Sequence, residues 1–301
     1  MRQRVAFIMK RSAWSTMVQP SGATRLRRLI AEGDPTVSRL RSTHDAHART
    51  VDELHAAFDR LGVEPVPIDD STRNITARRF ALVVTVGGDG TLLRASHSVR
   101  DAPVLGINSA PSSSVGFFCG VRGGDGVSVI RALERALEGR LSERLLTRMC
   151  VTVGKRTISE RVLNDALFCH RSPAATSRYL IEHNGQVEEH KSSGFWVGPA
   201  AGSTAAQRSA GGRVLSLKSR LLQLVVREPY TPSGERYGLL KVLVGPSEKI
   251  IVRSKMREAV LFLDGPDLGV TPQYGDVVTF QESSQPLRLL AIGGRRARSA
   301  G

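Results

Sequence analysis

The sequence predicts an α/β domain built on a parallel sheet, followed by a β-rich domain. In the first half, strand-like apolar runs alternate with segments of helical periodicity, which is typical of a parallel sheet with helices on both sides. A continuous apolar, β-branched run at 81–86 is typical of a central parallel strand. After about residue 141, short β-like runs replace the helical periodicity. We therefore expect an α/β domain over 1–140, a β-rich domain over 141–292 and a disordered basic tail over 293–301.

The elements of the first half follow from the spacing of their apolar residues. An apolar run at 5–9 predicts a short buried strand. Apolar residues then recur at helical spacing from Val51 to Leu61, and Gly62 is expected to end that helix. Beyond the strand at 81–86, the pattern predicts a helix over 91–98, a strand over 104–107 and a helix over 127–137 that ends at Gly139.

The second half is expected to be mostly β because turn residues separate short runs rich in β-branched residues. Asn184-Gly185 and Asp264-Gly265-Pro266 are examples of such turns. The predicted strands cover 149–153, 161–169, 177–182, 221–226, 249–252, 259–263 and 277–280.

Charge and cysteine content restrict the class of protein. The formal net charge of +15 comes from 43 Lys and Arg against 28 Asp and Glu, and a basic excess attracts polyanions, including nucleotides. The arginines are scattered and are not interleaved with aromatic residues, which disfavours a single-strand nucleic-acid surface. Cys119, Cys150 and Cys169 are odd in number and widely spaced, which argues against a disulfide framework and a zinc site. No run reaches the length of a membrane span, so we expect a cytoplasmic protein.

The strongest local signal is the loop Gly87-Gly88-Asp89-Gly90-Thr91 between a predicted strand and a predicted helix. Its glycines allow backbone N–H groups to face a phosphate, and the helix dipole adds positive potential. The loop has neither the Lys-Ser/Thr ending of a P-loop nor the third glycine of the dinucleotide fingerprint. Asp89 could bind a metal ion or accept a proton from an attacking hydroxyl. A tight Asp-Gly turn is the structural alternative.

Two segments of the second half carry weaker signals. The small residues and hydroxyls of 200–206 and 209–212 could line a pocket closely. Alternatively, Ser203 or Thr204 caps the start of a helix there and Gly211 its end. Asn164-Asp165 has the amide and carboxylate suited to adenine amino groups and ribose hydroxyls, although a surface turn is the usual explanation of such a pair.

Taken together and in order, these segments resemble the NAD kinase family. The resemblance covers roughly residues 4–290 and rests on the segments 87–97, 104–108, 116–117, 163–165, 202–205 and 209–212. Finer details are similar to a branch that includes plant NADH kinases: Ser192-Ser193-Gly194, Ala200-Ala201, Ala205-Ala206 and 226–229.

The resemblance implies a nucleotide-binding α/β domain, a dinucleotide-binding β-rich domain, an active site between them and a homo-oligomer. The implied reaction transfers the γ-phosphoryl group of ATP to the adenosine ribose 2′-hydroxyl of NAD or NADH, with Mg²⁺ bridging phosphates mainly through substrate oxygens and water. Asp89 is the expected acceptor of the hydroxyl proton. The expected nucleotide-binding residues are Gly88, Gly90, Thr91, Asn108, Asn164, Asp165, Lys191, Thr204, Ala205 and Ser209, of which Asn108 also supports the loop after its strand.

The chain departs from the commoner bacterial pattern at several positions of this resemblance, among them Pro111-Ser112-Ser113-Ser114 before Gly116. Asp165 stands where glutamate is usual, which shortens the reach of the carboxylate by one methylene. Ala206 replaces a tyrosine that packs on the dinucleotide, and Ser193 replaces an aspartate. These departures bear on the choice between NAD and NADH and do not touch Asp89.

The residues alone also allow two other functions. A kinase with the same loop could act on a lipid or sugar hydroxyl, and a basic protein could bind nucleic acid or nucleotides without catalysis. His44 and His47 lie three residues apart on a predicted helix, but no third ligand is near in sequence, so a polar helix surface is expected there.

Overall fold

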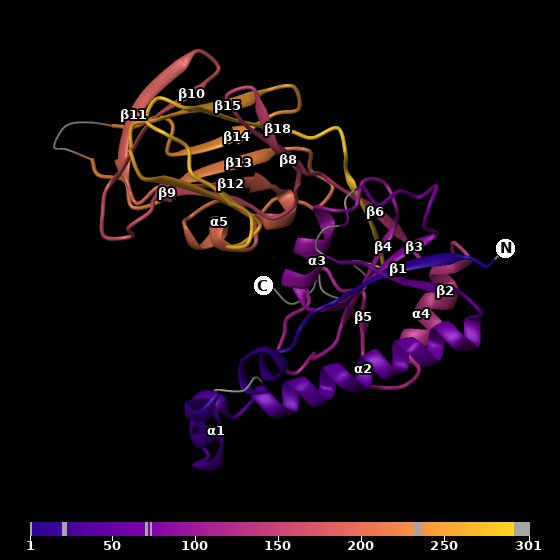
Figure 1. Cartoon of the computed structure of the whole chain (residues 1–301). Helices are drawn as coiled ribbons and strands as arrows, with labels where there is room; N and C mark the ends of the chain where they lie inside the picture. The colour runs from indigo at the N-terminus through magenta and orange to yellow at the C-terminus, as the bar shows by residue number, and fades with distance from the viewer. Residues whose placement is uncertain (1, 20–22, 70–71, 73, 232–235, 292–301) are drawn as a thin grey trace. The chain divides into compact units, whose positions relative to one another are not determined.

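The computed structural model describes residues 2–19, 23–69, 72, 74–231 and 236–291, which form two compact units (Figure 1). The first unit comprises Met1–Arg144 with Arg288–Gly301, and the second comprises Leu145–Leu287. The expected tail at 293–301 lies outside the described residues.

The first unit is built on a seven-stranded sheet in the order β2-β1-β3-β4-β19-β6, with β5 paired to β4. The pairs β1 with β2, β1 with β3, β3 with β4, β4 with β5 and β4 with β19 are all parallel, as the alternation in the sequence predicts. The strands are β1 (Arg4–Met9), β2 (Glu64–Pro67), β3 (Leu82–Gly87), β4 (Val104–Asn108), β5 (Val121–Arg122), β6 (Glu143–Leu146) and β19 (Leu287–Leu290).

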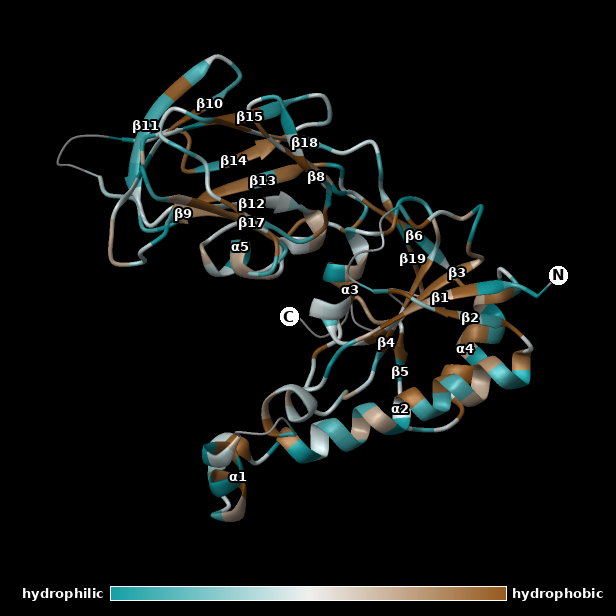
Figure 2. Cartoon of the chain, viewed as in Figure 1, coloured by the Kyte–Doolittle hydropathy of each residue, from teal (hydrophilic) through white to brown (hydrophobic). Residues whose placement is uncertain are grey.

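Helices cover both faces of this sheet. On one face, α2 (Leu40–Leu61) and α4 (Ser128–Leu137) bury apolar residues against the strands, and Gly62 ends α2 in the left-handed conformation as predicted. On the other face, α3 (Asp89–Ser96) places Leu92 against Gly106 of β4. Figure 2 shows the hydrophobic strands and the alternating hydrophobic and hydrophilic turns of α2. The unit also contains η1 (Trp14–Val18), α1 (Thr24–Ala31) and η2 (Pro35–Val37).

The second unit contains two six-stranded sheets with antiparallel pairing, in the orders β11-β10-β15-β18-β7-β8 and β14-β13-β12-β9-β16-β17. Strands of both sheets contribute to one apolar core, in which Phe168, Tyr179 and Phe195 pack ring against ring. The elements are β7 (Met149–Val153), β8 (Arg156–Val162), β9 (Ala166–His170), β10 (Ser177–His183), β11 (Gln186–Ser192), β12 (Phe195–Pro199), η3 (Ala200–Gly202), α5 (Ala206–Ser209), β13 (Leu222–Val226), β14 (Lys241–Val244), β15 (Lys249–Ser254), β16 (Ala259–Leu263), β17 (Gly269–Val270) and β18 (Val277–Glu282).

Two sequence predictions differ from the structure. The single strand expected over 161–169 is wrong, because β8 ends at Val162 and β9 begins at Ala166, with a break between them. The last strand, β19, returns to the parallel sheet of the first unit, so the expected range of 141–292 runs past the end of the second unit at Leu287. A four-residue strand that pairs with a partner so distant in sequence leaves no local pattern.

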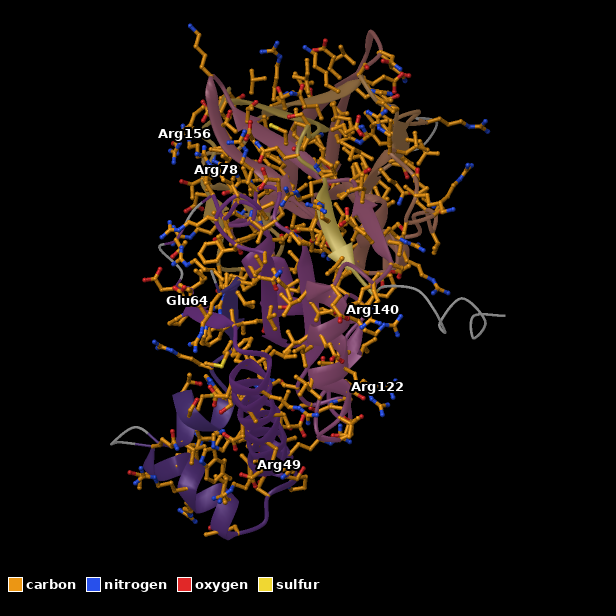
Figure 3. All side chains as sticks on the ribbon, turned by 90° about the vertical axis from the view of Figure 1, so that its right-hand side faces the viewer. Arg49, Glu64, Arg78, Arg122, Arg140 and Arg156 are labelled. Atoms are coloured by element: carbon orange, nitrogen blue, oxygen red, sulfur yellow. The ribbon has the colours of Figure 1, made fainter. Side chains whose placement is uncertain are left out.

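The positive charge is spread over exposed side chains. Arg49, Arg78, Arg122, Arg140 and Arg156, labelled in Figure 3, are all exposed and come from separate segments. Within the part of the chain that the structure describes, no helix is both long enough and apolar enough to cross a bilayer.

Candidate functional site

The glycine loop lies where β3 ends and α3 begins, as the sequence predicts. Gly88 is the residue before the first turn of α3 and has an extended backbone. A Cβ on Gly87 would lie 2.1 Å from the hydroxyl of Thr91, and a Cβ on Gly88 would lie 2.5 Å from the hydroxyl of Ser114. Gly87 therefore requires glycine, because Thr91 approaches too closely for a larger residue, whereas at Gly88 a larger residue would have to displace the Ser114 hydroxyl.

The carboxylate of Asp89 is held by two consecutive backbone amides. The N–H of Phe117 donates to Oδ2 at 2.9 Å and the N–H of Phe118 donates to Oδ1 at 2.8 Å. Hydrogen bonds from N–H groups to a carboxylate are stronger than bonds between neutral groups, so this pair fixes the orientation of the side chain. Burial, followed by the charge of Asp89, raises the pKa of the neighbouring Cys119 thiol to about 12.

Asn108 organises the loop that carries those two amides. Its Nδ2 donates to the carbonyl of Ser114 at 3.0 Å, and its Oδ1 accepts from the N–H of Ala110 at 3.2 Å. Gly116 has φ of +61°, and a Cβ there would lie 2.3 Å from Nδ2 of Asn108. The side chain is buried and bonded within its own loop, which agrees with the expected supporting role; its contact with a nucleotide stays a prediction.

The segment Asn164-Asp165 lies at the break between β8 and β9, in the second unit. Oxygens of the Asp264 carboxylate accept the N–H groups of Leu163 at 2.8 Å, Asn164 at 2.7 Å and Asp165 at 3.0 Å. These bonds replace the strand ladder, which explains why the predicted strand over 161–169 is interrupted. The side chains of the pair also meet, since Nδ2 of Asn164 donates to Oδ2 of Asp165 at 2.8 Å.

Asp165 is buried, with 6% of its surface exposed. Burial, followed by the charge of Asp264, raises the pKa of the Asp165 carboxyl to about 7. Near neutral pH this carboxyl therefore exchanges between a neutral form that donates a hydrogen bond and a charged form that only accepts one.

The small-residue segment packs directly against Asn164. A Cβ on Gly202 would lie 1.7 Å from the carbonyl oxygen of Asn164, and one on Gly198 would lie 2.3 Å from the same atom. The small-residue segment and Asn164-Asp165, which carry the two weaker sequence signals, are therefore in contact. Around them, Thr204, Ala205 and Ser209 are exposed.

The predicted helix caps in this segment are wrong in part. Ser203 does not cap α5; it is fully buried, and its hydroxyl donates to the carbonyl of Ala200 at 2.7 Å and accepts from the N–H of Leu215 at 2.9 Å. Ala205 precedes the first turn of α5 and contributes no side-chain cap. Gly211 has the left-handed backbone expected just past the end of a helix.

Several residues that shape these regions have no sequence pattern that indicates their role. Asp264 stands in an ordinary turn sequence, although its carboxylate organises a segment 99 residues away. Gln207 and Gln223 form a buried amide pair beside Asn164, with Nε2 of Gln223 donating to Oε1 of Gln207 at 3.0 Å. The sequence contains no local signal for this pair, because its members lie on separate elements.

The last candidates from the sequence are Lys191, as a phosphate partner, and the histidines of the α2 helix. Lys191 is half-buried on β11 opposite Arg178 of β10, and its role at a phosphate stays a prediction. Among the described residues, no three His, Cys, Asp or Glu side chains gather closely enough to hold a metal ion. The polar helix surface expected at His44 and His47 is wrong for His47, which is buried and hydrogen-bonds Ser109 at 2.8 Å.

Comparison with known proteins places the chain in a family. Residues 2–140 match the family model described as ATP-NAD kinase N-terminal domain. An NADH kinase from Arabidopsis thaliana is 30% identical over 85% of this chain and 86% of its own length, and a probable NADH kinase from Oryza sativa subsp. japonica is 29% identical over 81% of each chain. The crystal structure of an NAD kinase from Archaeoglobus fulgidus in complex with ATP has the same fold, with a TM-score of 0.65, 22% identity and coverage of 96% of this chain and 94% of that one. The chain belongs to the NAD kinase family.

Proposed function

We propose that this protein phosphorylates NAD or NADH with ATP, giving NADP or NADPH. The observation that carries the proposal is the Asp89 carboxylate in a glycine loop at the start of α3, in a chain of the NAD kinase family. The family relation supplies the substrates, since the relatives are named NADH kinase and NAD kinase.

In the proposed reaction, the adenosine ribose 2′-oxygen attacks the γ-phosphorus of ATP. The bond from that phosphorus to the bridging oxygen breaks, and ADP leaves with the bonding electrons. A carboxylate oxygen of Asp89 accepts the hydroxyl proton. The amides of Phe117 and Phe118 hold the carboxylate in one orientation, which reduces the entropy lost when the hydroxyl aligns.

The remaining groups bind and orient in this proposal. Gly88, Gly90 and Thr91 bind the phosphates at the positive end of α3, with backbone N–H groups offered by the two glycines, since the N–H of Thr91 donates to the carbonyl of Gly88 at 3.1 Å. Asn164 and Asp165 bind an adenosine, with their backbone N–H groups held by Asp264 and their side chains hydrogen-bonded to each other. Thr204, Ala205 and Ser209 are exposed and have small side chains, which suits close contact with a dinucleotide.

We propose Mg²⁺ or another divalent cation as the cofactor, carried chiefly by phosphate oxygens and water. The residues fit that arrangement because the two oxygens of Asp89 already accept backbone amides and no three-ligand cluster occurs among the described residues. When bound, the cation neutralises phosphate charge.

The direct test is an assay of the purified protein with ATP and, separately, NAD, NADH, diacylglycerol and a sugar phosphate. Formation of NADP or NADPH, detected with an NADP-specific dehydrogenase, is the expected result. Phosphorylation of the lipid or sugar alone would contradict the proposed substrate class.

We further propose a cytoplasmic homo-oligomer. The three cysteines are free, which suits a reducing compartment, and the family resemblance supplies the expectation of self-association. Cell fractionation and light scattering on the purified protein test the two statements separately, and a monomer at the concentration of the assay would contradict the second.

A further inference from the structure

His47 lies at the carboxyl end of the parallel sheet, on the face covered by α2. Its Nδ1 is 2.8 Å from the hydroxyl of Ser109, the first residue after β4. The charge of Lys10, the first residue after β1, also acts on the ring. The imidazole is thus tied to the end of β4, which pairs with β3, the strand that leads into the glycine loop.

Ser109 connects this ring to the glycine loop through two hydrogen bonds, and a third holds it to α2. Its hydroxyl meets His47, its N–H donates to the carbonyl of Gly87 at 3.0 Å, and its carbonyl accepts from the hydroxyl of Thr50 at 3.3 Å. Ser109 is therefore fixed to α2 on one side and to the first residue of the loop on the other. It is also the start of the segment that leads to Phe117 and Phe118, whose amides hold Asp89.

The imidazole that bonds Ser109 is neutral. A charged ring could only donate to the Ser109 hydroxyl, whereas a neutral ring with its proton on Nε2 can accept a hydrogen bond from that hydroxyl at Nδ1. Burial, followed by the charge of Lys10, lowers the pKa of His47 to about 4, which keeps the ring neutral at physiological pH. His47 is 7% exposed and Ser109 is 1% exposed, so water does not replace either partner readily.

We propose that His47 is a positioning residue: through Ser109 it sets the geometry of the Gly87–Gly90 loop and of the segment that orients Asp89. The inference rests on the proposed function, because it assigns the residue to the same reaction. His47 does not touch the reacting atoms in this account, so its replacement changes turnover more than substrate affinity.

Two substitutions of His47 test its hydrogen bond to Ser109. The side-chain amide of His47→Asn reaches the position of Nδ1 and preserves the bond to Ser109, whereas that of His47→Gln reaches the position of Nε2 and loses it. We expect His47→Gln and Ser109→Ala each to lower kcat between about tenfold and a hundredfold, with KM unchanged within about twofold. We expect His47→Asn to retain most of the wild-type kcat.

The double variant and a control complete the kinetic test. If His47 acts through Ser109, the loss of kcat in His47→Gln with Ser109→Ala is no larger than in either single variant, whereas independent roles would multiply the two losses. His55 lies on the same helix and is exposed, so His55→Gln is the matched control with wild-type kcat. A wild-type kcat in folded His47→Gln, or full multiplication in the double variant, would overturn the inference.

Amide hydrogen exchange provides a readout that does not depend on activity. In His47→Gln, the amides of Phe117 and Phe118 should exchange at least about tenfold faster than in the wild type, while those of the second-unit core are unchanged. Unchanged exchange at both amides would contradict the inference. If the wild type formed no NADP or NADPH, the proposed function would be wrong, and the exchange result would still decide whether His47 controls this segment.

Discussion

The glycine loop of the first unit and the Asn164-Asp165 segment of the second unit both depend on an aspartate that accepts consecutive backbone amides. In the first unit, the aspartate that accepts the amides, Asp89, is also the proposed reacting group. In the second unit, the accepting residue is Asp264, and the proposed binding groups are the residues that it holds. Backbone amides therefore orient the Asp89 carboxylate, whereas the Asp264 carboxylate orients the backbone of the residues that bind it.

This difference explains why the two regions differ in how visible they are from sequence. Asp89 stands inside a run of glycines between a strand and a helix, so its local pattern already indicates a phosphate site. Asp264 is distant from the segment that it organises and looks like an ordinary turn residue. A group that reacts has a local signature, whereas a group that positions others acts through long-range contacts.

The largest expected effect comes from Asp89→Asn. The amide keeps the size of the side chain but cannot accept the hydroxyl proton, so we expect kcat to fall by about 10²–10⁴. Steady-state kinetics measure this loss, and circular dichroism checks the fold. Asp59→Asn on α2, at an exposed position, is the control and should retain full activity. Near-normal turnover by Asp89→Asn would show that the carboxylate is not the base.

Asp264→Asn is expected to affect stability and binding together. The residue has φ of +52°, which asparagine tolerates well, so the substitution removes the charge without adding backbone strain. Loss of charge-assisted bonds to three amides should lower the free energy of unfolding by about 2–3 kcal/mol and raise KM for the dinucleotide. Urea unfolding and initial rates measure the two quantities. A stable variant with unchanged KM would break the comparison between the two aspartates.

Asp165 predicts a pH dependence of stability. Its pKa in the folded protein is about 7, above the ordinary value of 3.8, so the folded state holds the proton more tightly than the unfolded state does. The stability contributed by this group is fully present below pH 3.8 and is lost as pH rises through about 7. The difference in unfolding free energy between the wild type and Asp165→Asn should therefore fall from pH 4 toward pH 7 and then level off. Urea titrations at several pH values measure it, and a difference that rises with pH would contradict the account.

The smallest effect is expected from Thr204→Ala. The side chain is exposed, so the free energy of unfolding should change by less than about 0.5 kcal/mol. If the hydroxyl binds the dinucleotide, KM for NAD or NADH should rise a few-fold while kcat is nearly unchanged. Thr157→Ala on β8, which is also exposed, serves as the control with no effect on KM. Equal KM values in both variants would remove Thr204 from the binding residues.

The sequence predicted the parallel sheet, its helices and most strands of the second unit, because those elements have a period that apolar residues reveal. It also predicted the position of the glycine loop and the supporting role of Asn108. It did not predict the break at Asn164-Asp165, since Asp264 causes it from a distant strand end. It assigned His47 to a polar surface because the spacing of two histidines does not indicate which one faces a sheet.

A crystal structure with NADH and a non-hydrolysable ATP analogue would show whether Asp89 reaches the reacting hydroxyl. We expect a carboxylate oxygen of Asp89 about 2.6–3.2 Å from the adenosine ribose 2′-oxygen, with the γ-phosphate next to the glycine loop. A bound dinucleotide whose ribose lies beyond hydrogen-bonding reach of Asp89 would contradict this expectation.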